Sequence, residues 1–169
     1  NQYFAANGYF VLEVNFRSST GYGEKFLWAT WGAWGTKDGQ DVMAGIDYAI
    51  SKYPIDRKRV ASIGHSYGGF MTNWLITQYP DRFAAAASGA GIVNWTSDYG
   101  NADIPRTKEM EFYGAPWDAR AREIMIATPI SQISGFAKLL SASFMASAGL
   151  SLVTPVSATR NRAPGGSFI

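Results

Sequence analysis

Hydrophobic and polar residues follow one another along the first half of the chain in segments that indicate strands and helices in turn. Residues 9–15, 59–63 and 83–88 are short and apolar, which predicts three buried strands. Residues 38–53 and 67–79 carry apolar side chains at helical spacing, and each range is followed by a proline, which predicts two long helices. Alternation of strand and helix is typical of an α/β protein with a parallel sheet and right-handed crossovers.

The remaining segments are less regular. Residues 1–7 are predicted to be the last turns of a helix that Gly8 caps. Residues 16–23 read as a loop, residues 91–117 as a long loop rich in aromatic side chains, and residues 119–127 as a further helix.

Composition narrows the class of protein. The 169 residues are 47% hydrophobic and 15% aromatic, which excludes a disordered chain and suits one domain with a sizeable core. A net charge of +2 is too small to indicate a nucleic-acid-binding surface, so no nucleic-acid partner is expected. The one long apolar stretch, 83–93, is too short to span a bilayer, so no membrane association is expected. The absence of cysteine excludes disulfides and fits a reducing compartment, so we expect a cytoplasmic protein.

Charge distribution changes near residue 123. All 13 acidic residues, all 6 Trp and all 9 Tyr lie at or before that position, and the rest of the chain is rich in Ser and Ala. One interpretation is an ordinary Ser/Ala-rich helix with a loose end. The other is a tail that does not belong to the fold encoded before it.

The candidate chemistry lies between the second predicted strand and the second long helix, in GHSYGG at residues 64–69. In a nucleophile elbow, a serine sits on a sharp strand-to-helix turn with its hydroxyl exposed, and small residues are needed two positions before and after it. Gly64 and Gly68 meet that need around Ser66, and Gly69 follows. The N–H of Tyr67, at the start of the helix, would then face a developing oxyanion. The alternative is an ordinary glycine-rich turn.

A catalytic base is harder to find. His65 is the only histidine, and because it directly precedes Ser66, its ring cannot easily turn back to accept the hydroxyl proton. We therefore assign His65 a supporting place in the elbow. No histidine follows Ser66, so the sequence holds a nucleophile without its base. One histidine and no cysteine also make a metal site unexpected, and no cofactor is implied.

Several segments together resemble the catalytic domain of the prolyl oligopeptidase family, in its acylaminoacyl-peptidase and dipeptidyl-peptidase-like branch. They are FAANGY at 4–9, NFRSSTGYG at 15–23, WGTKDGQD at 34–41, IDRKRV at 55–60 and GHSYGGF at 64–70. The resemblance extends from residue 1 to about 130, which we take as a partial α/β-hydrolase domain, with a parallel sheet and flanking helices.

The resemblance implies a serine peptidase that cleaves short or N-blocked peptides through an acyl-enzyme on Ser66, with the Tyr67 N–H as an oxyanion donor. It also implies a β-propeller domain in the full-length protein. Trp95 and Tyr99 follow the third strand, where the family builds part of its substrate pocket, and core or loop packing is an equal alternative for them. A carboxylesterase or lipase on the same fold, or a non-catalytic relic, remains an alternative function.

The sequence also departs from the family pattern. Ser18 stands where the family has glycine, which predicts mild strain if the backbone there has a positive φ. The family's His-Gly-Gly-Pro segment and the strand leading to it would precede residue 1, so a gap is expected between strands 9–15 and 59–63. Residues 131–169 are interpreted as a divergent or frame-shifted tail, poorly ordered, and the chain as inactive or nearly so. Arg17 is expected to be a structural hydrogen-bond donor rather than a clamp for a substrate carboxylate.

Overall fold

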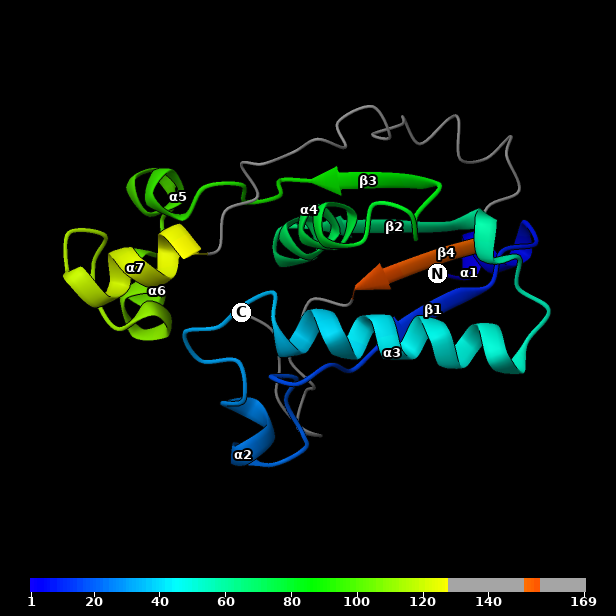
Figure 1. Ribbon diagram of the computed structural model, residues 1–169, viewed down its shortest axis with the longest axis horizontal. Coiled ribbons are helices and arrows are strands. Elements are labelled where there is room, and N and C mark those ends of the chain that lie inside the picture. The colour runs from blue at the N-terminus through cyan, green and yellow to red at the C-terminus, as the bar shows by residue number, and fades with distance from the viewer. Residues whose placement is uncertain (128–150, 156–169) are drawn as a thin grey trace, which may run out of the picture.

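A parallel sheet of four strands in the order β1-β4-β2-β3 forms the centre of the computed structural model (Figure 1). The structure describes residues 1–127 and the backbone of residues 151–155. The strands are β1 (Val11–Val14), β2 (Val60–His65), β3 (Ala85–Gly89) and β4 (Ser151–Pro155). The parallel strands and intervening helices confirm the α/β class that the sequence predicts.

Small side chains on β2 and β3 let a helix pack closely on this part of the sheet, where Ser62 and Ala86 pair in register and are fully buried on the face that the helix covers. The neighbouring pair, Ala61 and Ala85, is almost completely buried on the opposite face of the sheet. Helix α4 (Tyr67–Gln78) lies against the two strands. The hydroxyls of Ser62 and Thr72 are 3.0 Å apart between β2 and α4, so two buried polar groups satisfy each other.

The main core lies between the sheet and the pair of helices α3 (Lys37–Lys52) and α4. Val42 and Ile46 from α3 meet Phe70 and Leu75 from α4, and each is at most 2% exposed. Burying a side chain of this size contributes roughly 1.5–3 kcal/mol of transfer free energy. A smaller apolar cluster includes Phe4 of α1 (Gln2–Ala6) and the two buried alanines of β2 and β3.

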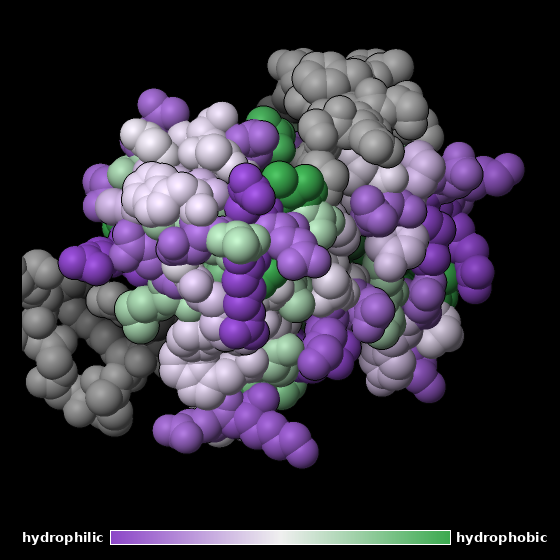
Figure 2. Space-filling view, turned by 60° about the vertical axis from the view of Figure 1, so that its left-hand side comes forward, coloured by the Kyte–Doolittle hydropathy of each residue, from purple (hydrophilic) through white to green (hydrophobic). Residues whose placement is uncertain are grey.

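Three short helices gather beyond the end of the sheet to which β3 and β4 point, at the left of Figure 1. They are α5 (Trp95–Asn101), α6 (Pro105–Phe112) and α7 (Ala119–Ala127). In Figure 2, which brings this side forward, hydrophobic colour is confined to small areas among hydrophilic side chains. Two single-turn elements, α2 (Glu24–Leu27) and the 3-10 turn Arg57–Arg59, complete the described helices.

Most predicted elements are confirmed within a few residues, including the helix at 119–127. The long loop predicted for 91–117 is wrong, because it contains α5 and α6. The Asn94 side chain caps α5 by accepting a hydrogen bond from the Ser97 N–H at 2.8 Å, and Pro105 starts α6. The cap and the proline mark the starts of two helices that are too short for their periodicity to be recognised.

The predicted gap between the strands at 9–15 and 59–63 is also wrong, since β4 pairs with β1 on one side and β2 on the other. We expect a division of the chain near residue 130 and a poorly ordered tail over 131–169. Apart from β4, these positions lie outside the described residues. Within the described part of the chain, no helix has the length and hydrophobicity needed to cross a bilayer.

Candidate active site

Ser66 lies on a sharp turn between β2 and α4, and its backbone has φ 59° and ψ −119°. A positive φ is unusual for a residue with a side chain and costs about 1–3 kcal/mol, so the surrounding structure must hold it. The Ser66 N–H donates to the Gly89 carbonyl at the end of β3 at 2.8 Å, and its carbonyl accepts from the Phe70 N–H at 2.9 Å. Its side chain is exposed and makes no capping bond to the helix. The hydroxyl is thus presented to solvent from a fixed backbone.

Two glycines of the motif allow the backbone of the first turn of α4 to approach β2 and the end of β3 closely. A Cβ on Gly64 would lie 2.2 Å from the Gly68 carbonyl oxygen, and a Cβ on Gly69 would lie 2.5 Å from the Gly89 oxygen. Both distances are far below van der Waals contact. The motif therefore packs the first turn of α4 directly against β2 and the end of β3.

The Tyr67 side chain is anchored by a buried carboxylate. Its hydroxyl donates to Asp38, which is 0% exposed and also accepts from the N–H groups of Gly35 (3.1 Å) and Gly39 (3.0 Å). Burial raises the pKa of Asp38, although these three hydrogen bonds oppose the shift. The pKa of Tyr67 is raised well above its usual range, mainly by burial and secondly by the negative charge of Asp38. As the first residue of α4, Tyr67 has an N–H without an intrahelical acceptor, next to the Ser66 hydroxyl.

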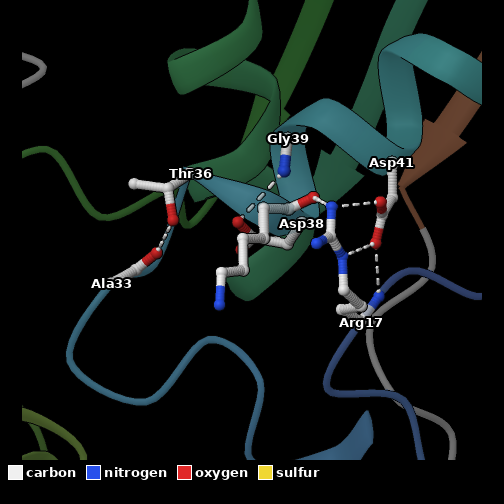
Figure 3. Close-up of polar contacts among 7 residues, drawn as sticks. Arg17, Ala33, Thr36, Asp38, Gly39 and Asp41 are labelled. Atoms are coloured by element: carbon white, nitrogen blue, oxygen red, sulfur yellow. Dashed lines mark hydrogen bonds and ion pairs between the residues drawn. The ribbon is translucent and has the colours of Figure 1, made fainter.

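Beside Asp38, an ion pair ties the loop after β1 to the first turns of α3 (Figure 3). The Arg17 guanidinium donates to both oxygens of Asp41, at 2.6 and 2.8 Å, and the Arg17 N–H donates to the same carboxylate at 2.9 Å. Partial burial acts to raise the pKa of Asp41, but the hydrogen bonds and charge of Arg17 outweigh it and lower that pKa. This is the structural role expected for Arg17.

Ser18 has φ 84°, which meets the condition under which mild strain is expected for a serine in place of the family's glycine. Its hydroxyl bonds to the Thr30 hydroxyl, and the Thr30 N–H donates to the Ser18 oxygen at 3.3 Å. Thr30 is only 2% exposed. The serine thus gains a partner that glycine would lack.

The other predicted site residues are dispersed. His65 is exposed, and its ring carbon Cδ2 lies 3.0 Å from where a Cβ on Gly89 would be, on the β3 side of the elbow. Trp95 is 2% exposed and its ring lies 5.0 Å from Trp34 and from Phe70, which matches the core-packing alternative. The Tyr99 hydroxyl donates a hydrogen bond to Glu109 at 2.6 Å. This bond is the main reason why the pKa of Tyr99 is raised.

A cavity that the sequence does not predict lies next to Tyr67. It has a volume of about 320 Å³, and the residues that line it include Tyr67, three tryptophans from residues 28–34 and Glu111. The tryptophans come from a segment between β1 and α3, and Glu111 comes from α6. The high local density of Trp was the only signal in the sequence.

Comparison with known proteins places this arrangement among peptidases. The family model described as "Prolyl oligopeptidase family" matches residues 1–151. An uncharacterized peptidase of Bacillus subtilis, YuxL, is 49% identical over 104 residues, which are 61% of this chain and 16% of that protein. Acylamino-acid-releasing enzyme 1 of Oryza sativa is 41% identical over 109 residues, covering 64% of this chain and 14% of that protein.

The fold agrees with a solved structure as well. The acylaminoacyl peptidase of Pyrococcus horikoshii superimposes with a TM-score of 0.61 and 35% identity, over 69% of this chain and 19% of that one. The chain spans less than a fifth of the length of these relatives.

Proposed function

Since the chain belongs to the prolyl oligopeptidase family, as an acylaminoacyl-peptidase-like member, we propose that Ser66 is the nucleophile of a serine peptidase. The single observation that carries this proposal is the strained, exposed Ser66 at the junction of β2 and α4. A serine in this conformation points its hydroxyl away from the sheet, where a carbonyl carbon can approach it.

The proposed reaction is acyl transfer from a short or N-blocked peptide. The Ser66 oxygen adds to the scissile carbonyl, the amine leaves with a proton, and water then releases the acyl group from the serine. The Tyr67 N–H is suited to stabilise the oxyanion, since it is free of the helix and its residue is anchored through Asp38. We propose that Asp38 positions this donor and does not touch the substrate.

We further propose that residues 1–169 alone hydrolyse their substrates feebly. His65 is the only histidine, and its ring lies beside Gly89. A nucleophile without a base retains at most the roughly 10³–10⁴-fold acceleration over water that an intact oxyanion hole and binding site provide. The base and its orienting carboxylate would come from the rest of a full-length protein, in which a β-propeller would restrict access to larger substrates.

A reactive probe and a turnover assay test the two parts separately. A fluorophosphonate should label Ser66 slowly, Ser66→Ala should abolish labelling, and Ser97→Ala, an exposed serine of α5, should not. Absence of labelling, or labelling elsewhere, would contradict the nucleophile. Chromogenic acyl-amino-acid and dipeptidyl amides and an activated ester should turn over feebly; fast turnover that depends on Ser66 would contradict the missing base. Preference for the ester alone by the full-length protein would favour the esterase alternative.

A further inference from the structure

The cavity beside Tyr67 combines aromatic walls with one carboxylate. Its volume of about 320 Å³ lies at the lower end of the usual range for ligand pockets, which suits a single side chain. Phe16, Trp31, Trp34 and Tyr67 line it, and Trp28, which also belongs to the lining, is 49% exposed. A pocket with this wall favours an occupant that has an apolar stem.

Glu111 is the charged residue among those that line the cavity, and Ser18 and Thr30 also belong to the lining. One of the Glu111 carboxylate oxygens accepts a hydrogen bond from the indole N–H of Trp34 at 3.2 Å. Burial raises the pKa of Glu111, and the bond from Trp34 only partly opposes it. None of the ion pairs among residues 1–127 involves Glu111. A partly buried carboxylate without a cation is costly, and a positively charged ligand would lower that cost.

The aromatic rings reinforce the same preference. Trp28 and Trp31 lie edge to face at 4.7 Å, and Trp34 and Tyr67 do so at 4.9 Å. Ring faces attract ammonium and guanidinium groups, most strongly when water is excluded. Trp34 is also packed against the buried rings of Trp95 and Phe112, so this wall is set before any ligand arrives.

We propose that this cavity binds the side chain of a lysine or arginine residue of a peptide, with the charged group against Glu111 and the methylene stem between the aromatic rings. Tyr67 lines the cavity and directly follows Ser66 in the chain, so one residue links the cavity to the elbow. The proposal deepens the proposed function and rests on it for the statement that the ligand is part of a substrate. It makes the peptidase selective for basic residues.

Equilibrium binding tests the pocket without any chemistry. The probes are N-acetyl-arginine amide and its uncharged counterpart N-acetyl-norleucine amide, added to chain 1–169 while the Trp34 indole N–H resonance and tryptophan fluorescence are followed. We expect the arginine probe to bind and to shift the Trp34 resonance, and the norleucine probe to bind at least about 10-fold more weakly.

Glu111→Gln keeps the shape of the side chain and an oxygen for Trp34 but removes the charge, so it should weaken arginine binding about 10-fold or more. Glu123→Gln, which neutralises an exposed carboxylate on α7, is the matched control and should leave binding unchanged. Thermal unfolding of both variants verifies that they fold. Equal affinity for the two probes, no binding of arginine, or unaltered binding in Glu111→Gln would overturn the proposal.

Ser66→Ala separates this proposal from the nucleophile assignment. That variant should bind the arginine probe as the unaltered chain does, since its hydroxyl is not part of the cavity wall. Binding that survives while fluorophosphonate labelling fails at Ser66 would leave the pocket standing and remove the peptidase mechanism. Labelling of Ser66 without arginine binding would do the reverse.

Discussion

Replacing Gly64 by alanine tests whether the elbow depends on close backbone packing. The added Cβ would lie 2.2 Å from the carbonyl oxygen and 2.3 Å from the carbonyl carbon of Gly68, roughly 1 Å or more inside van der Waals contact. Overpacking usually costs about 1–3 kcal/mol, and the upper end applies because backbone atoms cannot rotate away. We expect Gly64→Ala to lower the free energy of unfolding by about 3 kcal/mol, and Tm by about 6–12 °C.

Gly100→Ala is the matched control. Gly100 lies within α5, a Cβ there meets nothing within 4 Å, and its φ is not positive. Alanine should therefore stabilise the chain by about 0.5–1 kcal/mol through its higher helix propensity. Urea unfolding followed by tryptophan fluorescence, with thermal unfolding followed by circular dichroism, measures both variants. A Gly64→Ala stability within about 0.5 kcal/mol of the unaltered chain would refute the argument.

Two further predictions concern the loop after β1. Ser18→Ala should destabilise the chain by about 1–3 kcal/mol, because the buried Thr30 hydroxyl loses its partner. Ser18→Gly loses the same bond but relieves the positive φ, so it should be about 1 kcal/mol more stable than the alanine variant in urea unfolding. Equal stabilities of the two variants would contradict this. The pKa of Asp41 is lowered in the folded chain, so its contribution is fully present well above the ordinary value of 3.8 and is lost as pH falls below it. Asp41→Asn should therefore lower the free energy of unfolding by about 1 kcal/mol at pH 7 and by progressively less in acid. Asp103→Asn, at an exposed position, is the control. A loss of stability that does not depend on pH would count against the role of Arg17.

The sequence was sufficient for features that depend on local pattern. Apolar runs and proline breaks located β2, α3 and α4, and the glycines of residues 64–69 predicted the sharp turn that Ser66 adopts. The family's glycine at position 18 pointed to strain there only on the condition of a positive φ, which the structure supplies. These features are encoded within a few residues of where they occur.

Features that depend on distant segments could not be found in this way. The cavity needs the tryptophans of residues 28–34 to meet Glu111 of α6, and only the folded chain brings them together. The anchoring of Tyr67 by Asp38 joins two helices, and neither residue type signals it. Helices α5 and α6 were hidden because they are short, and because the Asn94 cap and Pro105 mark their starts rather than hydrophobic spacing.

The position of β4 has a consequence for how the chain reaches this fold. Leu152 pairs with Val11 and Ser151 with Val60, so closing the sheet joins parts of the chain that are synthesised far apart. Such non-local pairing slows folding, because the entropy cost of closing a long loop must be met before the contacts form. Until residues 151–155 leave the ribosome, β1 and β2 each carry an open edge that another chain can pair with. The yield of folded protein in the cell therefore depends on how long those two edges are shielded from other chains.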